Sequence, residues 1–330
     1  MAVLAEIDGP DVLTDVLASL RLRGRLFCRS ELSAPWSLAL PASALGHFHV
    51  IERGGGWVRL EGEERSHPLA AGDLIVLPHG RAYTLSDGPK APPVPLASLV
   101  HEPASGVCSI LRHGGDGPAT SMICGSFQFE GREGHPLLSL LPPLIHIPGD
   151  QGRSAEWLDL TLRFLAQEAR HPRPGSETLV TRLIDILFVQ VVRAWIEGQP
   201  EGGGGWLGAL RDRQMGAALG MIHREPQRAW SVASLAAAVG MSRSAFAARF
   251  TALVSEAPLA YLTRWRMHLA ADLLRGKGLT LSEVAGRVGY ESEAAFSKAF
   301  KRQVGTSPGA FRTGPRVPAA APLAEPRPAA

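Results

Sequence analysis

The sequence predicts an α+β protein: an N-terminal domain of short β-strands with two connector helices, then an all-α C-terminal domain of two helix-turn-helix units. Three observations predict this division. Short apolar runs separated by glycine and proline clusters dominate residues 25–148. A segment near the C-terminal end is repeated once. The net charge changes sign at the glycine run Gly202–Gly205, from −6 before Trp206 to +9 from Trp206 onward.

Length and composition narrow the class of protein. A chain of 330 residues is long enough for two domains with separate cores, and 45% hydrophobic with 20% charged residues is typical of ordinary globular proteins. The most apolar stretch without a charge, Pro136–Pro148, is too short for a membrane-spanning helix. Because Glu6 and Asp8 lie where a secretory signal would be basic, we expect a cytoplasmic protein without a membrane segment.

The first predicted element is a helix over Asp11–Leu22, which has apolar residues at helical spacing. From Arg25 to about Pro148 the alternation of apolar runs with turn residues favours an all-β sandwich or barrel. We interpret Gly54–Gly56 as the turn of a hairpin between two of these strands.

Two connector helices are predicted between Ala155 and Glu197, with an interruption at His171–Gly175. The second begins at Ser176 and has a broad apolar face that must be buried. It packs either on its own β-domain or on a second copy of the chain, and both alternatives stay open. The face comprises Leu179, Leu183, Ile186, Leu187, Gln190 and Val191.

Four segments follow from these patterns. We expect a β-domain with its connector helices over residues 1–200 and a glycine-rich linker over 201–210. The double helix-turn-helix domain is expected over 211–313, and a disordered tail rich in proline and alanine over 314–330.

The C-terminal repeat aligns Ser231–Met241 with Thr280–Tyr290 at an offset of 49 residues, which becomes 50 after one additional residue. Each copy has a Ser or Thr that can cap a first helix and a glycine that allows the positive φ of a tight turn. A serine then caps a second helix, whose inner face is anchored by a Phe-x-x-x-Phe pair. The paired positions are Ser231 and Thr280, Gly240 and Gly289, Ser242 and Ser292, Phe246 and Phe296, Phe250 and Phe300, Pro258 and Pro308, and Tyr261 and Phe311.

The outward face of each second helix carries basic and small polar residues, which suits the major groove of DNA. A long helix over Pro258–Arg275 is predicted between the copies, holding the two units at a fixed separation. Such a spacer allows both helices to enter successive major grooves, about 34 Å apart. The outward residues are Arg243, Ser244, Ala247, Ala248 and Arg249 in the first copy and Glu293, Ala294, Ser297, Lys298, Lys301 and Arg302 in the second.

On the basis of these residues, the chain resembles the AraC/XylS family of bacterial transcription regulators over about residues 215–312. The most specific part is Gly289–Arg312, which is close to the family signature. The N-terminal part resembles the cupin-type sensor of one branch of that family. The matching segments there are Phe27–Trp36, Cys124-Gly125, His135–Leu138 and Leu141–Pro143.

The resemblance implies a cupin-like β-barrel that binds an effector or dimerises, and a regulator that is more commonly an activator. It further implies double-stranded DNA and RNA polymerase as partners, with an effector that is a small molecule or an oxidant. Family base-reading positions fall on Ser244, Ala247, Ala248, Glu293, Ala294, Ser297 and Lys298. The alanines depart from a strongly hydrogen-bonding reader. Either they contact thymine methyl groups, or the first unit mainly positions the domain through Arg243 and Arg249 on phosphates.

The cupin resemblance also raises the hypothesis of a metal site. His47 and His49 occupy alternate positions of one predicted strand, with Glu52 nearby, and His79 or His101 is the candidate fourth ligand. Tyr83 stands where the second cupin motif usually supplies a histidine. We therefore favour a metal-free sensor pocket and predict no cofactor.

Two other classes of function compete with a regulator. A metal-dependent cupin enzyme fused to a DNA-binding domain is the main alternative, and the missing ligand weighs against it. A DNA-organising protein without a sensor would leave the acidic β-domain without a role. Because no P-loop, dinucleotide fingerprint or catalytic triad is present in the sequence, we predict that the chain is not an enzyme.

The three cysteines, Cys28, Cys108 and Cys124, fit neither a disulfide framework nor a structural zinc site. Cys28 and Cys124 lie in the sensor-like segments, so they are candidate redox sensors. Arg25 and Arg29 flank Cys28 and would favour its thiolate, although their odd separation along a strand directs them away from the sulfur. Inert buried thiols are the alternative.

Overall fold

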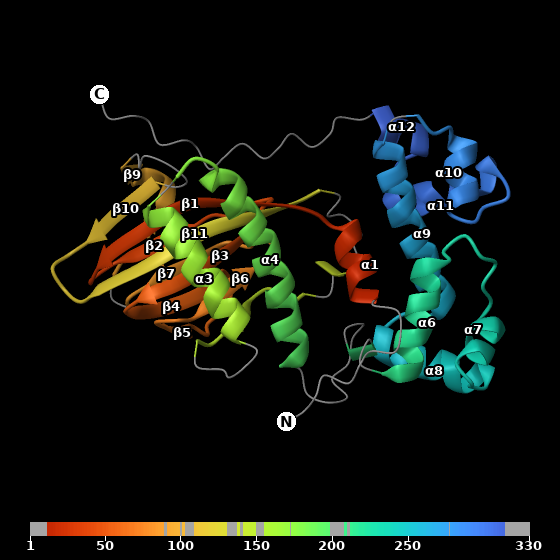
Figure 1. The fold of residues 1–330 in the computed structure, drawn as a ribbon, viewed down its shortest axis with the longest axis horizontal. Helices are drawn as coiled ribbons and strands as arrows, with labels where there is room; N and C mark the ends of the chain where they lie inside the picture. Colours follow the sequence, from red (N-terminus) through yellow and green to blue (C-terminus); the bar gives the residue numbers. More distant parts are fainter. Residues whose placement is uncertain are drawn as a thin grey trace. The chain divides into compact units, whose positions relative to one another are not determined.

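The computed structural model describes residues 12–88, 91–99, 101–102, 109–130, 137–138, 141–149, 155–171, 173–198, 208–209, 212–276 and 278–313. The chain forms two compact units (Figure 1). A β unit comprises residues 22–129 and 141–197, and a helical unit contains residues 198–316. The N-terminal helix α1 (Val12–Ser19) is grouped with the helical unit.

The β unit consists of two sheets, in agreement with the predicted sandwich or barrel. One has seven strands in the order β12-β6-β3-β11-β1-β10-β9, and the other has five in the order β5-β4-β7-β2-β8. The strands are β1 (Arg21–Ser33), β2 (Ser37–Leu40), β3 (Gly46–Arg53), β4 (Gly55–Leu60), β5 (His67–Ala70), β6 (Leu74–Leu77), β7 (Tyr83–Ser86), β8 (Val94–Pro95), β9 (His101–Glu102), β10 (Ser109–Gly114), β11 (Ala119–Glu130) and β12 (Ile145–Ile147), with a 3-10 turn, η1 (Leu96–Ser98).

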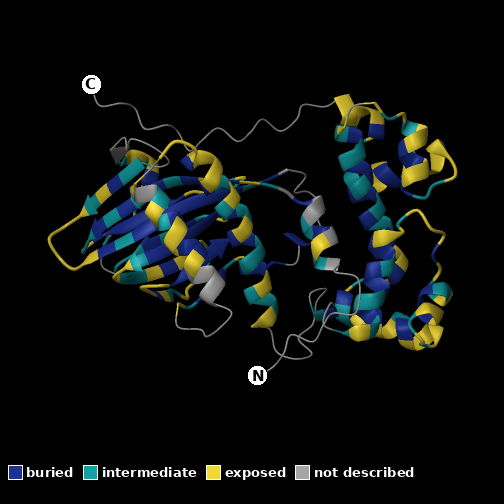
Figure 2. Cartoon of the chain, viewed as in Figure 1, coloured by how far each residue is buried: buried dark blue, intermediate teal, exposed yellow. Residues whose placement is uncertain are grey.

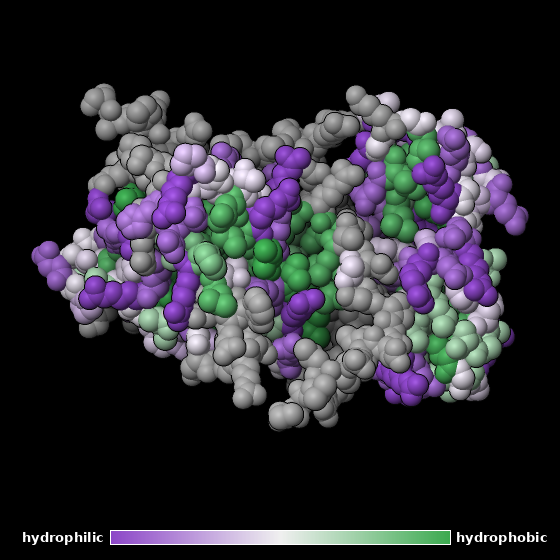
Figure 3. Space-filling model, viewed as in Figure 1, coloured by the Kyte–Doolittle hydropathy of each residue, from purple (hydrophilic) through white to green (hydrophobic). Residues whose placement is uncertain are grey.

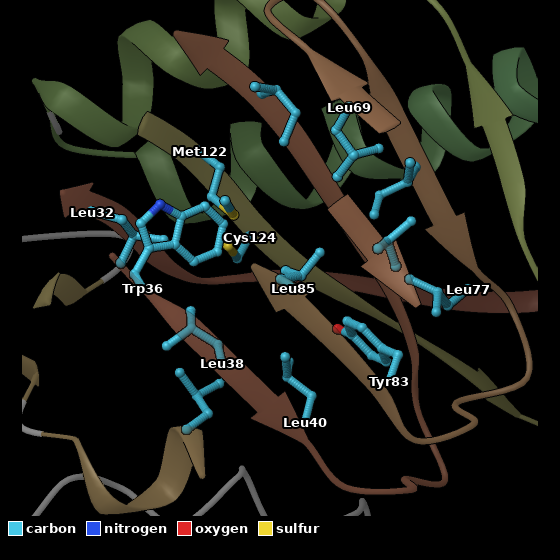
Figure 4. Close-up of a cluster of buried hydrophobic side chains, with 14 of the residues drawn as sticks. Leu32, Trp36, Leu38, Leu40, Leu69, Leu77, Tyr83, Leu85, Met122 and Cys124 are labelled. Atoms are coloured by element: carbon cyan, nitrogen blue, oxygen red, sulfur yellow. The ribbon is translucent and has the colours of Figure 1, made fainter. Parts of the chain in front are cut away.

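Side chains from both sheets form one core. In Figure 4, Leu38, Leu40 and Leu85 of the five-stranded sheet lie in the same cluster as Leu77 and Cys124 of the seven-stranded sheet. Buried and accessible residues alternate along β4, β5 and β7, as expected where only one face of a sheet is covered by the other. Figure 2 shows the strands as the most continuously buried part of the unit.

The glycines at residues 54–56 form a different turn from the predicted hairpin. Gly54 has a φ of 78°, which suits glycine, but β3 belongs to the seven-stranded sheet and β4 to the five-stranded sheet. The chain therefore crosses from one sheet to the other there. Sequence pattern alone does not distinguish the two turns, because both need glycine between apolar strands.

The two connector helices are present as α3 (Ala155–Arg170) and α4 (Ser176–Glu197), which pack on each other. Helix α4 covers the outer face of the seven-stranded sheet, where the Phe188 ring lies 5.2 Å from those of Phe127 and Phe129. The buried face is rotated from the predicted one: Leu187 and Val191 are buried, but Leu179 and Ile186 are 43% and 48% exposed. The helix is apolar on more than one side, so its periodicity does not define the buried face.

The helical unit begins with α1, which lies within the predicted Asp11–Leu22 helix and packs on α6 (Arg213–Arg224). The predicted repeat is present as α7 (Val232–Ala238) and α8 (Arg243–Val254), then α10 (Leu281–Arg287) and α11 (Glu293–Val304). Helix α9 (Pro258–Arg275) is the predicted spacer, and α12 (Pro308–Thr313) follows α11.

The predicted helix caps and turns are also found. The side chains of Ser231 and Thr280 accept hydrogen bonds from backbone N–H groups at the start of α7 and α10, and each helix begins with a capping box. Gly240 and Gly289 follow these helices with φ values of 70° and 80°. The glycine run Gly202–Gly205 and the proline-rich tail lie outside the described residues.

Among the helices that the structure describes, none is both long and apolar enough to span a bilayer.

Candidate functional site

One pair of phenylalanines anchors the second helix of each helix-turn-helix unit. Phe246 and Phe250 on α8, and Phe296 and Phe300 on α11, are completely buried. The rings within each pair lie 5.6 and 5.7 Å apart. The caps Ser242 and Ser292 accept hydrogen bonds from backbone N–H groups in the first turn of each helix. One face of each helix is thereby fixed, and the opposite face is available to a partner.

The residues predicted to face DNA lie on that opposite face. All are exposed except Ala247 and Ser297, which are half-buried. Among the described residues, no ion-pair partner is found for four cations of this face, which are Arg243, Lys298, Lys301 and Arg302. Such cations on an exposed helix face provide the charge that phosphate contacts require.

Arg249 differs from the other predicted phosphate contacts. It forms an ion pair with Asp212, and its Nη1 lies 3.5 Å from the Gln214 side-chain oxygen. Asp212 is the N-cap of α6 and accepts backbone hydrogen bonds at that helix end. Arg249 therefore braces α8 against the start of α6, a role that its outward position in the sequence pattern does not predict.

The two units are supported by different groups. In the first, the imidazole of His223 on α6 forms a 2.5 Å hydrogen bond with the Tyr261 hydroxyl and stacks on Trp265 with ring centroids 4.0 Å apart. Burial, with the nearby charges of Arg264 and His268, lowers the pKa of His223 to about 3. In the second unit, the Phe311 ring takes the place of Tyr261 and packs on the Phe300 ring at 5.4 Å.

A second cluster of functional groups lies inside the β unit, on strands β1, β3, β7 and β11. The Ser30 hydroxyl lies 3.5 Å from the Cys28 sulfur and 3.6 Å from the Cys124 sulfur. His49 Nδ1 is 3.1 Å from the Cys124 sulfur, and His49 Nε2 is 2.6 Å from the Tyr83 hydroxyl. We call Cys28, Ser30, His47, His49, Tyr83 and Cys124 the buried thiol cluster; none of the six is more than 3% exposed.

The hydrogen bonds of the buried thiol cluster form a directed chain. His47 Nδ1 also contacts the Tyr83 hydroxyl, at 3.1 Å, while His47 Nε2 is buried with no hydrogen-bond partner among the described residues. A buried nitrogen lone pair without a donor costs less than a buried N–H without an acceptor. This favours the assignment in which His47 donates to Tyr83, Tyr83 donates to His49, and His49 Nδ1–H donates to the Cys124 sulfur.

The two histidines of the buried thiol cluster are uncharged at neutral pH. Burial lowers the pKa of His47 to about 4. Burial and the proximity of His47 lower the pKa of His49 to about 3. Burial and the two sulfur atoms raise the pKa of the Tyr83 hydroxyl. Both imidazoles therefore act as neutral hydrogen-bonding groups.

The predicted metal-ligand set does not come together. His47 and His49 face Tyr83, but Glu52 is held by Arg29, with Nε and Oε2 2.9 Å apart. His79 Nε2 is bound to the Leu141 carbonyl oxygen, and the side chain of His101 lies outside the described part of the structure. Within the described ranges, no three His, Cys, Asp or Glu side chains are placed to hold a metal ion. The candidate ligands that the structure describes therefore do not form a metal centre, and the carboxylate of Glu52 is paired with Arg29.

Arg29 does not act on Cys28. Its guanidinium pairs with Glu31 and Glu52, and Arg25 is exposed. The alternation along β1 therefore directs these charges away from the sulfur, as the odd spacing indicates. His49 and Ser30, not an arginine, are the polar neighbours described for the Cys124 sulfur.

Two residues of these sites are missing from the sequence interpretation: Ser30, in the buried thiol cluster, and Asp212, which holds Arg249. Tyr83 is identified from the sequence only as the residue in place of a ligand histidine, and its hydrogen bond with His49 is not predicted. Ser30 lies two residues after Cys28 on the same strand, so strand periodicity provides a signal for it. No local pattern pairs Tyr83 with His49 or Asp212 with Arg249, because these contacts join distant segments.

Comparisons with known proteins match both units. A family model described as Cupin matches residues 11–197, and a model described as Helix-turn-helix domain matches residues 235–314. The Cupin match includes α1, which packs on α6 in the structure.

Relatives match along nearly the whole chain. An AraC-like transcription regulator from Streptomyces lividans is 38% identical over 93% of this chain and 100% of its own length. The HTH-type transcriptional regulator AlkR of Acinetobacter baylyi is 32% identical over 92% of this chain and 99% of its own. The RCS-specific HTH-type transcriptional activator RclR of Escherichia coli is 28% identical over 92% of this chain and 97% of its own.

Proposed function

The chain belongs to the AraC-like transcription regulators with an N-terminal cupin domain, and we propose that α8 and α11 bind successive major grooves of an operator under control of a signal received in the β unit. The observation that carries the proposal is the pair of capped, phenylalanine-anchored helices, each of which leaves its other face exposed. Successive grooves on one side of B-form DNA are about 34 Å apart, which a rigid α9 can match.

We assign different DNA contacts to the two helices. On α11, Ser297 and Lys298 read base edges together with Glu293 and Ala294, while Lys301 and Arg302 neutralise phosphates. On α8, Ala247 and Ala248 contact thymine methyl groups beside Ser244, and Arg243 binds a phosphate. We do not assign Arg249 to a phosphate, because its guanidinium forms an ion pair with Asp212.

Selection of bound duplexes from the source genome by the purified full-length chain tests this function. We expect one enriched sequence and an affinity that falls steeply with salt, because each neutralised phosphate releases counterions. Lys301→Gln should reduce the slope of log affinity against log salt by about one unit. Arg182→Gln, which removes an exposed cation of the β unit, is the control and should leave the slope unchanged. Failure to enrich any sequence would contradict the proposal.

The signal is proposed to act at Cys28 and Cys124. Hypochlorous acid accepts two electrons from two thiols, so a disulfide forms while chloride, water and a proton are released. The directed chain places a hydrogen-bond donor, His49 Nδ1–H, against the Cys124 sulfur. Burial opposes the reaction and limits it to small oxidants. A relative named as an RCS-specific activator supports this class of signal.

A reporter assay with hypochlorite tests the thiols. We expect the oxidant to change promoter output, and Cys28→Ser or Cys124→Ser to abolish the response while the folded protein still binds DNA. Cys108→Ser is the matched control and should respond like the wild type. An unchanged response in the Cys28→Ser, Cys124→Ser double variant would remove the thiols from the mechanism and favour a small molecule in the barrel as the signal.

A homodimer through α3 and α4 is the proposed assembly. Leu160, Phe164, Leu179 and Ile186 are between 43% and 55% exposed on these two helices, and Figure 3 shows apolar surface over them. Exposed apolar side chains grouped on adjacent helices are typical of protein interfaces. Sedimentation of the wild type and of Phe164→Asp should give a dimer and a monomer, respectively. A monomeric wild type would contradict this assembly.

We also propose activation through contact with RNA polymerase, which the family resemblance implies. A cytoplasmic location and the segment boundaries 1–200, 201–210, 211–313 and 314–330 are proposed from the sequence patterns. No enzymatic activity is proposed, because the relatives are named as transcription regulators and the candidate metal ligands do not converge.

A further inference from the structure

We propose that Arg266 is a positioning residue that locks the two helix-turn-helix units in one relative orientation and thereby sets the spacing of the two DNA segments they read. This role depends on the proposed binding of both units to one operator. Arg266 lies on the spacer helix α9, half-buried between the units.

On one side, Arg266 holds the loop between α6 and α7 of the first unit. Its Nε donates to the Pro226 carbonyl oxygen at 2.6 Å, and its Nη2 donates to the Arg228 carbonyl oxygen at 2.8 Å. Two bonds from one planar guanidinium fix both the position and the direction of the loop.

The loop that Arg266 holds is itself well braced. The Trp230 indole N–H donates to the Glu225 carbonyl oxygen at 3.0 Å, and the Arg228 guanidinium lies 4.1 Å from the Trp230 ring centroid. Arg228 also pairs with the Glu225 carboxylate at 2.9 Å. A restrained loop transmits the position of Arg266 to the start of α7.

On the other side, Arg266 contacts the turn of the second unit. Its guanidinium lies 5.8 Å from the centroid of the Tyr290 ring, within the range of a cation–π contact. A β-carbon on Gly289 would lie 2.7 Å from Arg266 Nη2 and 2.6 Å from the Gln227 carbonyl oxygen. The turn before α11 therefore lies directly on the loop before α7, with Arg266 between them.

The equivalent glycine of the first unit shows that this contact is specific to the second. Gly240 has a similar positive φ, but a β-carbon there would meet no atom within 4 Å. Glycine is needed at Gly240 for its backbone conformation alone, whereas Gly289 also allows the two units to approach.

Binding to operators of altered spacing tests the proposal. The probes are the duplex selected by the wild-type full-length chain and two derivatives with one base pair inserted or removed between the two protected segments. One base pair rotates the second segment by about 35° around the DNA axis. We expect the wild type to lose about tenfold or more in affinity for either derivative, because a rigid pair of units cannot follow the rotation.

Arg266→Ala should bind the selected duplex about tenfold more weakly and lose less than about threefold on either derivative. Arg266→Lys should recover only part of the discrimination, because an ammonium group lacks the planar fork. Arg264→Ala is the matched control: it removes an arginine of the same helix that pairs with Glu256 inside the first unit. It should keep the wild-type discrimination, and an Arg266→Ala protein that also keeps it overturns the proposal.

A second pair of variants keeps the proposal testable if Arg266→Ala fails to fold. Gly289→Ala should displace Arg266 and relax the discrimination, whereas Gly240→Ala should strain its turn and leave the discrimination intact. Equal discrimination in both glycine variants overturns the proposal. A wild type that tolerates both altered spacings contradicts the proposed two-unit binding itself, and the role of Arg266 fails with it.

Discussion

The two helix-turn-helix units share a backbone plan but differ in the groups that support and extend it. Both begin with a capping box, turn at a glycine and bury a phenylalanine pair. The first unit is supported by a buried imidazole–phenol hydrogen bond, and its α8 presents mostly small residues beside Arg243. The second has an apolar support, and its α11 presents Lys298, Lys301 and Arg302. The same scaffold is thus compatible with a positioning unit and a base-reading unit.

Removal of an anchoring phenylalanine ring from either unit should give the largest change in stability. Phe296→Ala and Phe246→Ala should each lower the free energy of unfolding of the helical unit by about 3–5 kcal/mol, because each leaves a cavity in a completely buried site. Chemical denaturation measures the change. Retained stability with lost DNA binding in Phe296→Ala would show that the assigned inner and outer faces of α11 are exchanged.

Acid pH should lower the stability of the first unit, which contains the buried imidazole of His223. The folded-state pKa of His223 is about 3, below the ordinary value of 6.5, so the unfolded state binds a proton more readily. The stability that this imidazole contributes is present above pH 6.5 and is lost as the pH falls toward 3. At about pH 5 the loss should be roughly 2 kcal/mol.

Hydrogen exchange of the α6 and α9 amides, corrected for intrinsic rates, checks this loss. Arg264 and His268 both disfavour a charge on His223, and they stay in place in His223→Gln. This variant should lose the pH dependence between about pH 7 and 5. A wild-type first unit that is equally stable at both pH values would contradict the assignment of His223 as a neutral buried group.

Base recognition should separate α11 from α8. Lys298→Ala should cost about 1–3 kcal/mol of binding free energy at one or two base positions and little elsewhere, because a base contact is sequence-specific. Arg243→Ala should weaken binding to all sequences alike, because phosphates are common to all. Affinities for a panel of single-base operator variants measure both. A uniform loss with Lys298→Ala would assign that side chain to a phosphate.

How far the sequence predicts each region depends on the range of its contacts. The helix-turn-helix units follow from local signals: a cap such as Thr280, a turn glycine such as Gly289, and phenylalanines four residues apart. The buried thiol cluster depends on contacts between strands that are distant in the chain. Strand periodicity places His47 and His49 on one face, but their partner Tyr83 comes from the other sheet.

The predictions that differ from the structure also depend on contacts between segments that are distant in the chain. Proximity along β3 groups Glu52 with the histidines, yet Arg29 on β1 holds its carboxylate. The buried face of α4 is not defined by the pattern because both Ile186 and Ile184 are apolar, and only packing on the sheet decides between them. The outward position of Arg249 suggests a phosphate contact because Asp212, its partner, lies 37 residues away.

The smallest expected difference between the units lies at the ends of their second helices. Ser255 ends α8 with a φ of 62°, and Gly305 ends α11 with a φ of 84°. A left-handed conformation costs a residue with a side chain about 1 kcal/mol, while glycine adopts it freely but loses more conformational entropy on folding. Ser255→Gly should therefore raise the free energy of unfolding by about 0.5–1 kcal/mol. Gly305→Ala should lower it by a similar amount, since a β-carbon there meets no atom within 4 Å and only backbone strain remains. Thermal unfolding of the two variants beside the wild type measures both changes, and a destabilised Ser255→Gly would show that the serine side chain stabilises the end of α8 by more than its backbone strain.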